Sequence, residues 1–263
     1  MLTRFDKMFN GVSRVSASLR DAALTMLYPN ACRVCGELIE SWRDGVACAN
    51  CWQEVERKRT PESFCAKCGA PLEPLPSRVA LDQRRCGRCT GLAFNFARAC
   101  GPYEGALRES VLTLKLYPHI APRLRQMLRQ TFAALPEAEA IESIIPVPLH
   151  PTRLAERGFN QAEIIARELA SDAGLRVDRA GLVRVKKTER HRTGMGARER
   201  ARSLDQAFNV RASRLIEGRA LLVVDDVMTT GSTAHEIAET LLRASARSVH
   251  ILTLARAMSE FGR

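Results

Sequence analysis

The sequence predicts an α/β protein in which a parallel sheet is flanked by helices and preceded by a small cysteine-rich, metal-binding module. Three observations support this prediction. Eight of the nine cysteines fall in four Cys-x-x-Cys pairs within residues 30–91. From about residue 92, short apolar runs alternate with segments of helical periodicity. One apolar run, residues 220–226, ends on two adjacent aspartates, and small hydroxyl residues around a glycine follow it.

The composition limits the class of protein. The chain has 263 residues, of which 46% are apolar and 26% charged, as in ordinary globular proteins. Its formal net charge of +11 favours phosphate-rich ligands, nucleic acid or an anionic membrane, although a charge that only keeps the protein soluble gives the same composition. No uncharged apolar run approaches the ~18 residues of a membrane span, and the N-terminus lacks the apolar core of a secretory signal. We therefore expect a cytoplasmic protein without a transmembrane segment.

Three segments are expected along the chain. Residues 1–28 form an N-terminal amphipathic helix, because apolar side chains recur at helical spacing until Pro29. This helix either lies on a membrane or a partner or, the favoured alternative, packs on its own domain. Residues 29–91 form the metal-binding module, and residues 92–263 form the α/β domain.

The elements of the α/β domain follow from periodicity and from stop signals. Cys100, which is unpaired, lies in the first strand and is expected to be buried as a small apolar residue. Gly174 should end one helix. Strands are expected over 96–103, 143–148, near 175–185, over 220–226 and over 248–256; helices from Glu104, over 120–135, 160–174 and 233–244; and irregular stretches over 70–83 and 186–208.

The paired cysteines predict structural zinc. Two pairs separated by 12 residues make a first quartet, and two pairs separated by 17 residues make a second. Zinc prefers four thiolates in a tetrahedron, and each Cys-x-x-Cys turn supplies two, so disulfides are the less favoured alternative. The quartets bind one or two zinc ions, sequentially or interleaved, and the sequential arrangement is favoured. The ligands would be Cys32, Cys35, Cys48, Cys51, Cys65, Cys68, Cys86 and Cys89.

A four-thiolate site is closed, so its role is structural rather than catalytic. The module could still present a surface to DNA or to a partner, because arginines, a lysine and three aromatic residues lie between its cysteines. Such aromatic residues either stack on unpaired bases or form the small core of the module.

The double aspartate predicts a ligand with hydroxyl groups. A parallel strand delivers its carboxyl end to the ligand crevice of an open α/β sheet, where two unpaired carboxylates would be costly to bury. The residues 229–233 then lead into a helix, and N–H groups at a helix N-terminus bind phosphate. Acids that bind a diol beside a phosphate cradle fit a ribose 5-phosphate. An ordinary helix cap would explain one hydroxyl residue, but not four with a glycine and two acids.

Two long motifs carry a resemblance. The stretch LLVVDDVMTTGST (221–233) resembles the signature of the type I phosphoribosyltransferase fold, which binds phosphoribosyl pyrophosphate (PRPP). Together with IIPVPLHPTRLAERGFNQAEIIARELA (144–170), it is similar to the ComF family, whose members join a cysteine-rich zinc ribbon to a phosphoribosyltransferase domain. The resemblance covers nearly all of the chain from Pro29 to Arg256 and implies that fold, with a double zinc-ribbon module.

The resemblance also implies a PRPP site in which Mg²⁺ accompanies the ligand. Lys115 lies where the family has a lysine near this site, although an exposed helix lysine is an equal alternative. Arginine forks suit a pyrophosphate. No residue stands out as a general base. The ribose and 5-phosphate residues would be Asp225, Asp226, Val227, Met228, Thr229, Thr230, Gly231, Ser232 and Thr233; those of the pyrophosphate and flexible loop would be Lys115, Arg153, Arg157, Gly158, Lys186, Lys187 and Arg192.

The stretch 184–202 holds eight Lys or Arg and two Glu, a local net charge of +6. By the resemblance it is a flexible loop that closes over PRPP; a solvated loop and a contact with a nucleic-acid backbone are the alternatives. The chain departs from the family pattern here, with Arg-Thr-Gly-Met at 192–195 in place of Gln-x-Gly-Leu, and Ser203 where Asn is common. These departures put individual loop contacts in doubt, but not the ribose-phosphate site.

Two functions are implied. A phosphoribosyltransferase would displace pyrophosphate from PRPP with an acceptor. Alternatively, a non-catalytic protein that binds single-stranded DNA would use the fold as a sensor or scaffold, with a protein of the competence machinery as its partner. The family is associated with natural transformation and with the use of DNA as a nutrient. The low aromatic content of 5% argues against an extended stacking platform.

Overall fold

The structure, a computed structural model, describes residues 23, 25–59, 64–72, 84–187 and 206–257. The helix predicted over residues 1–28 lies almost entirely outside the described residues, as does Arg192. Within the described ranges, no helix has the length and apolar character needed to cross a membrane.

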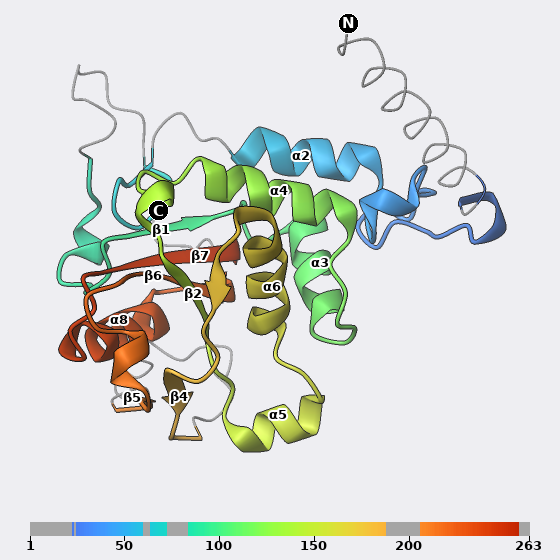
Figure 1. Ribbon diagram of the computed structural model, residues 1–263. Coiled ribbons are helices and arrows are strands. Elements are labelled where there is room, and N and C mark those ends of the chain that lie inside the picture. Colours follow the sequence, from blue (N-terminus) through green and yellow to red (C-terminus); the bar gives the residue numbers. More distant parts are fainter. Residues whose placement is uncertain (1–22, 24, 60–63, 73–83, 188–205, 258–263) are drawn as a thin grey trace, which may run out of the picture.

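A five-stranded parallel sheet forms the centre of the molecule (Figure 1). Its order is β1-β7-β6-β2-β3, so the two long strands lie in the middle and are buried on both faces. This burial explains their nearly unbroken runs of Val, Leu and Ile. The parallel sheet predicted from the alternation of elements is confirmed. The strands are β1 (Phe96–Ala99), β2 (Ser143–Pro146), β3 (Arg176–Val177), β6 (Ala220–Met228) and β7 (Ser248–Arg256).

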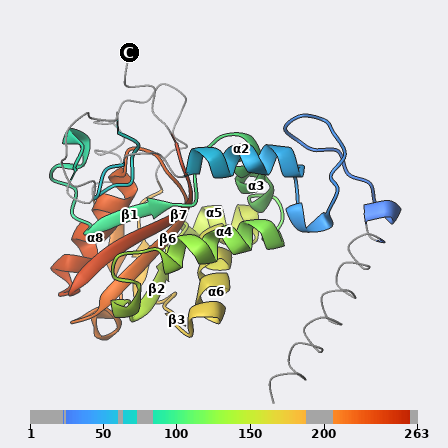
Figure 2. The same cartoon turned by 90° about the horizontal axis from the view of Figure 1, so that it is seen from above.

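Helices cover both faces of the sheet (Figures 1 and 2). On one face, Leu222 and Val224 of β6 belong to the same core as α2, α3, α4 and α6. On the other face, Leu221 and Val223 pack with α8 and with the antiparallel pair β4 and β5. The further bounds are α2 (Ala49–Arg59), α3 (Gly105–Leu114), α4 (Pro122–Ala133), α5 (Pro151–Arg157), α6 (Gln161–Ala173), α8 (Ser232–Arg243), β4 (Leu182–Arg184) and β5 (Phe208–Val210), with short 3-10 helices η1 (Trp42–Asp44), η3 (Gly87–Cys89), η4 (Ala138–Ala140) and η5 (Ser213–Leu215).

The structure corrects several predicted boundaries. β6 continues to Met228 rather than ending at residue 226, because β7 pairs with it as far as Arg256. The aspartates therefore lie within the strand. The following helix begins at Ser232, one residue earlier than predicted, and the first strand ends at Ala99. Helices α2 and α5 were not predicted, because neither has a continuous row of buried apolar residues.

The cysteine module borders the β1 edge of the sheet, and its two quartets belong to the cores on opposite faces. Cys32 and Cys48 pack in the core with α3 and α4, whereas Cys65 and Cys68 pack in the core with α8. Between them, the N–H of Ala97 in β1 donates to the carbonyl of Lys67 at 2.7 Å. The module and the sheet are therefore in direct contact along this edge.

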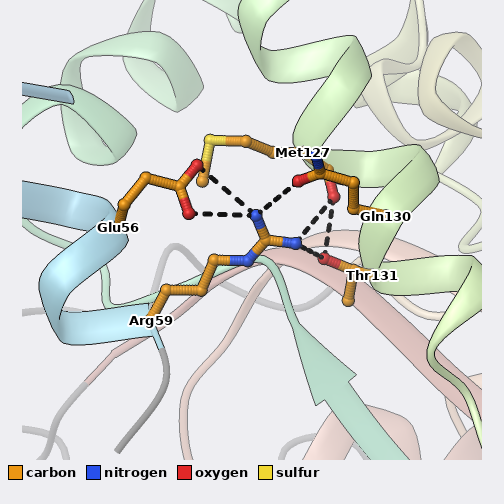
Figure 3. A network of polar contacts seen from close by, with 5 residues as sticks. All are labelled: Glu56, Arg59, Met127, Gln130 and Thr131. Atoms are coloured by element: carbon orange, nitrogen blue, oxygen red, sulfur yellow. Dashed lines mark hydrogen bonds and ion pairs between the residues drawn. The ribbon is translucent and has the colours of Figure 1, made fainter. Parts of the chain in front are cut away.

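One arginine ties the module to the α/β domain (Figure 3). Arg59, the last residue of α2, has a side chain that is only 13% exposed. Its guanidinium contacts the Glu56 carboxylate at 3.3 Å and donates to the Gln130 side chain at 2.9 Å. It also donates to the Met127 carbonyl at 3.2 Å and to the Thr131 hydroxyl at 3.0 Å. These contacts join α2 firmly to α4.

Cys100 lies close to this junction and is fully buried, as predicted. Burial raises the pKa of its thiol to about 11, so the thiol stays neutral at physiological pH. It behaves as a small apolar core residue rather than as a metal ligand or nucleophile.

Candidate functional site

The eight paired cysteines form two clusters suited to zinc. In each quartet, taken sequentially along the chain, the four sulfur atoms lie within 4.8 Å of one another. The closest sulfur pairs are 3.6 Å apart for Cys35 and Cys48, and 3.4 Å for Cys65 and Cys89. A tetrahedral zinc ion with Zn–S bonds of ~2.3 Å needs sulfur atoms ~3.8 Å apart, so both clusters fit the metal. The favoured sequential grouping is confirmed.

Backbone N–H groups lower the pKa of one thiol in each cluster. Burial raises the pKa of Cys65, but hydrogen bonds from the N–H groups of Cys68 and Cys86 outweigh it and lower the pKa to about 6. In the first cluster, burial likewise opposes backbone N–H donors, and the pKa of Cys32 is lowered to about 6. These donors therefore favour the thiolate form of one zinc ligand in each cluster, whereas burial raises the pKa of Cys68 to about 11.

The carboxylate of Asp226 belongs to a chain of polar contacts that runs from Lys115 to Arg157. It is 8% exposed, and its Oδ2 lies 3.1 Å from Nζ of Lys115 at the end of α3. The same oxygen accepts a hydrogen bond of 3.2 Å from Gln161, the first residue of α6. Arg157 of α5 donates to the Gln161 side chain at 2.6 Å. Three helices thus bring two cations and an amide to one strand end.

Asp225 has a different environment. It lines a small pocket together with Val147, Ser232 and Thr253, in the core that contains α8. Burial and the adjacent negative charge of Asp226 raise the pKa of Asp225 well above its ordinary value, although Lys115 opposes this. The carboxyl therefore sits in a site that disfavours its own charge.

The loop after β6 presents hydroxyl groups at the start of α8. Gly231 has a φ of +85°, a conformation that favours glycine, and it reverses the chain so that Ser232 begins the helix. The Thr230 and Ser232 hydroxyls lie 2.8 Å apart, and Thr229 is exposed. A loop of this kind at a helix N-terminus offers N–H and O–H donors to an anion.

The other residues implied by the resemblance have no contact with Asp226 among those described for it. Arg153 lies on α5, and Gly158 ends that helix with a φ of +82°. The two lysines at 186 and 187 are exposed just beyond β4. Arg192 lies outside the described residues, so its position is not assigned.

Two residues of this region escaped sequence reasoning. Gln161 was expected only to open a helix, yet its amide joins Arg157 to Asp226. Arg184 of β4 lies within electrostatic reach of the site: burial, then the charge of Arg153, lower its pKa, and Asp225 opposes this. The available signals were that Gln161 lies within the motif 144–170 and that Arg184 begins the basic stretch 184–202.

Two family models match the chain. The double zinc ribbon domain matches residues 23–90, and the phosphoribosyl transferase domain matches residues 154–262. The fold, the two cysteine quartets and these matches define a class of protein in which a double zinc ribbon precedes a domain of the phosphoribosyltransferase fold.

Relatives with similar sequences show which family within this class the chain belongs to. The DNA utilization protein YhgH of Salmonella typhimurium is 30% identical over 237 residues, which are 88% of this chain and 98% of the relative. Competence protein F of Haemophilus influenzae is 28% identical and covers 80% of this chain and 90% of its own length. Competence protein ComFC of Bacillus subtilis is 25% identical, with 78% and 89% covered. The chain belongs to the ComF family.

Solved phosphoribosyltransferases overlap with parts of the chain. A hypoxanthine phosphoribosyltransferase from Staphylococcus aureus has 14% identity and a TM-score of 0.32, covering 53% of this chain and 68% of that one. A purine phosphoribosyltransferase from Pyrococcus horikoshii has 15% identity and a TM-score of 0.31, covering 54% and 89%.

Proposed function

We propose that this protein binds PRPP with Mg²⁺ and transfers its phosphoribosyl group to an acceptor. The observation that carries the proposal is the arrangement at the end of β6. Two aspartates are followed at once by a hydroxyl-rich loop that begins α8, and Lys115 and Arg157 approach from other helices. Ribose hydroxyls would donate to the aspartates, and the 5-phosphate would accept from the residues 229–233.

The cationic side of the site suits the leaving group. In the proposed reaction, a lone pair of the acceptor forms a bond to the anomeric carbon, and the bond from that carbon to pyrophosphate oxygen breaks. The electron pair leaves with pyrophosphate, whose charge Lys115, Arg153 and Arg157 would neutralise. Mg²⁺ bound to the pyrophosphate would add to this stabilisation. The Gln161 amide would hold Asp226 and Arg157 in place as the ligand enters.

Calorimetry tests the proposal. PRPP would be titrated, with and without Mg²⁺, into the zinc-loaded wild type and into Asp225→Asn/Asp226→Asn. We expect Mg²⁺-dependent binding to the wild type and at least a hundredfold loss in the double variant, since two hydrogen-bonded charges worth roughly 1.5–3 kcal/mol each are removed.

The matched control is Glu139→Gln/Glu217→Gln, which removes two negative charges from exposed positions away from the site. It should bind as the wild type does. Absence of binding to a folded, zinc-loaded wild type would refute the proposal, and equal loss in both double variants would show that overall charge, not the site, is responsible.

A second candidate function is binding of single-stranded DNA; the relatives include a DNA utilization protein and a competence protein. The observation that favours it is a cavity of about 550 Å³ between α2, the second zinc ribbon and β1. It is lined by Arg57 and Lys58, and by Phe64, which is 38% exposed and has the Arg98 guanidinium 5.3 Å from its ring centre. Cations beside an aromatic ring suit a phosphate and a base.

Fluorescence anisotropy with a labelled single-stranded oligonucleotide tests this function. Wild-type affinity should fall steeply with salt, and Arg57→Ala/Lys58→Ala should reduce the slope of log K against log salt by about 1.4, at about 0.7 per phosphate contact. Arg243→Ala/Arg247→Ala, which removes two exposed cations elsewhere, should leave the slope unchanged. Equal effects of the two double variants would reject the cavity as the binding surface.

A further inference from the structure

The second zinc ribbon packs directly behind the loop that begins α8. Arg256, the last residue of β7, lies in register with Met228 of β6, immediately before this loop. Its guanidinium donates to the Cys68 carbonyl at 2.5 Å and approaches the Cys68 sulfur at 3.6 Å. The same group lies 3.4 Å from the Met228 sulfur. One side chain thus joins a zinc-ligand residue to the strand end that carries the loop.

A second connection runs through the segment that follows Cys89. The Lys67 ammonium donates to the Leu92 carbonyl at 2.6 Å, which fixes this segment against the ribbon. The N–H of Ala93 donates to Nδ1 of His235 at 3.0 Å, and His235 lies in the first turn of α8. A Cβ atom at Gly231 would lie only 3.3 Å from the Leu92 side chain. The ribbon is therefore connected to both ends of the loop, through Arg256 at one end and through the segment after Cys89 at the other.

Zinc in the ribbon would strengthen the Arg256 contact by charge. A zinc ion with four thiolates carries two net negative charges, and Cys65, Cys68 and Cys89 of this quartet are buried. Buried charge needs a counter-charge nearby. Arg256 supplies one, and Arg98, which donates to the Ala66 carbonyl at 2.9 Å, supplies another.

The first quartet reaches the site by a different route. Arg33, between two of its ligands, donates to the Thr113 hydroxyl of α3 at 3.1 Å in an exposed hydrogen bond. Thr113 precedes Lys115 by two residues. This contact concerns the cation beside Asp226 and not the hydroxyl loop, so the two quartets offer an internal comparison.

We propose that Arg256 and His235 are positioning residues that couple the second zinc ribbon to the loop 229–233, so that metal binding at this ribbon sets the rigidity of the loop and its affinity for a phosphate-bearing ligand. The part of the proposal that concerns affinity rests on the proposed function. The part that concerns rigidity stands on the contacts alone.

Hydrogen–deuterium exchange of the full zinc-loaded chain tests the coupling without any ligand. Arg256→Gln and His235→Leu should each raise the exchange rate of amides in peptides covering residues 228–235 roughly tenfold, the order expected when such a hydrogen bond is lost. His235→Asn should restore slow exchange, because its side-chain oxygen can accept the Ala93 N–H. Arg247→Gln is the matched control: it removes the same charge at the opposite end of β7, where Arg247 pairs with Glu142.

A second exchange experiment tests the role of the metal by replacing one zinc ligand in each quartet. Cys86→Ser in the second quartet should accelerate exchange in the loop more than Cys35→Ser in the first, with zinc content measured for both. Exchange at wild-type rates in Arg256→Gln and His235→Leu would overturn the proposal, as would equal acceleration by both cysteine variants.

A PRPP titration of the same variants separates the two proposals. Weaker binding in Arg256→Gln and His235→Leu than in Arg247→Gln is expected. If the wild type binds no PRPP, the proposed function fails while the exchange data still decide the coupling. If PRPP binds and the exchange rates do not change, the coupling alone is refuted.

Discussion

At the scale of single residues, Asp225 is held in an environment that opposes its ionisation. A carboxyl whose pKa is raised on folding binds its proton more tightly in the folded state. Its contribution to stability is therefore fully present below the unfolded pKa of about 3.9 and is lost as the pH rises through the raised folded value. Ionised Asp225 thus costs the protein stability at neutral pH, which is typical of a residue retained for binding.

Asp225→Asn should consequently be more stable than the wild type at neutral pH while binding PRPP less well. The gain should be on the order of 1 kcal/mol, and it should disappear below about pH 4, where the wild-type carboxyl is protonated. Melting temperatures of both proteins between pH 4 and pH 8 check this. Asp226→Asn is the comparison, because it removes the partner of Lys115 and should not stabilise. A wild type that is more stable than Asp225→Asn at neutral pH would contradict the interpretation.

The aspartate pair could be predicted from the sequence because it lies in a recognisable local pattern, whereas Lys115 was implied only by the family resemblance. Gln161 and Arg184 could not, because their importance comes from contacts across 65 residues of chain or across two sheets. A glutamine at the start of a helix looks the same whether its amide faces water or a buried carboxylate. Only the packing of α6 against β6 distinguishes the two cases.

At the scale of elements, the turn into α8 depends on Gly231. A Cβ atom there would lie 2.9 Å from the Met228 side-chain end and 3.3 Å from Leu92, in a backbone conformation with φ of +85°. Gly218 has a similar φ of +70°, but a Cβ atom there would meet nothing within 4 Å. The two glycines therefore separate backbone strain from crowding.

Gly231→Ala and Gly218→Ala should each destabilise the protein by about 1–2 kcal/mol, the cost of a left-handed conformation with a side chain. Only Gly231→Ala should also weaken PRPP binding, because Met228 and Leu92 must move to make room behind the loop. Denaturant unfolding and calorimetry on both variants provide the check. Equal PRPP affinities in the two variants would show that crowding behind the loop is unimportant.

Periodicity was sufficient to predict the elements whose apolar faces are continuous, such as α6 between Asn160 and Gly174. It failed for α2, where only Trp52 and Val55 are buried and the C-terminal half of the helix is mostly charged. It also ended β6 too early, because charged residues normally end a buried strand. Here pairing with β7 extends the strand through them.

At the scale of the whole molecule, Arg59 determines how firmly the zinc module is attached. Arg59→Leu should lower the free energy of unfolding by about 2–3 kcal/mol, since a mostly buried guanidinium loses its four partners and those partners lose their donor. Arg57→Leu in the same helix should leave the free energy of unfolding nearly unchanged, because Arg57 is exposed and pairs only with Glu54 within the described contacts. Urea unfolding with zinc content measured in parallel distinguishes them; similar losses would rule out the attachment.

The division into a cysteine module and an α/β domain followed from composition, but the relation between them did not. Sequence spacing favours sequential quartets over interleaved ones, and the structure groups the cysteines sequentially. It does not specify that one quartet joins the core on one face of the sheet and the other quartet the core on the opposite face. That arrangement depends on the position of β1, the edge strand that lies between the two quartets.

The contact between Ala97 and Lys67 has a consequence for solubility. β1 is an outermost strand, and its free backbone groups would otherwise template the addition of a strand from another molecule. The carbonyl of Lys67 accepts a hydrogen bond from one of these groups, the N–H of Ala97, and the ribbon covers the adjoining edge. Depleting the protein of zinc would therefore loosen the module, expose the backbone groups of this edge strand and favour aggregation.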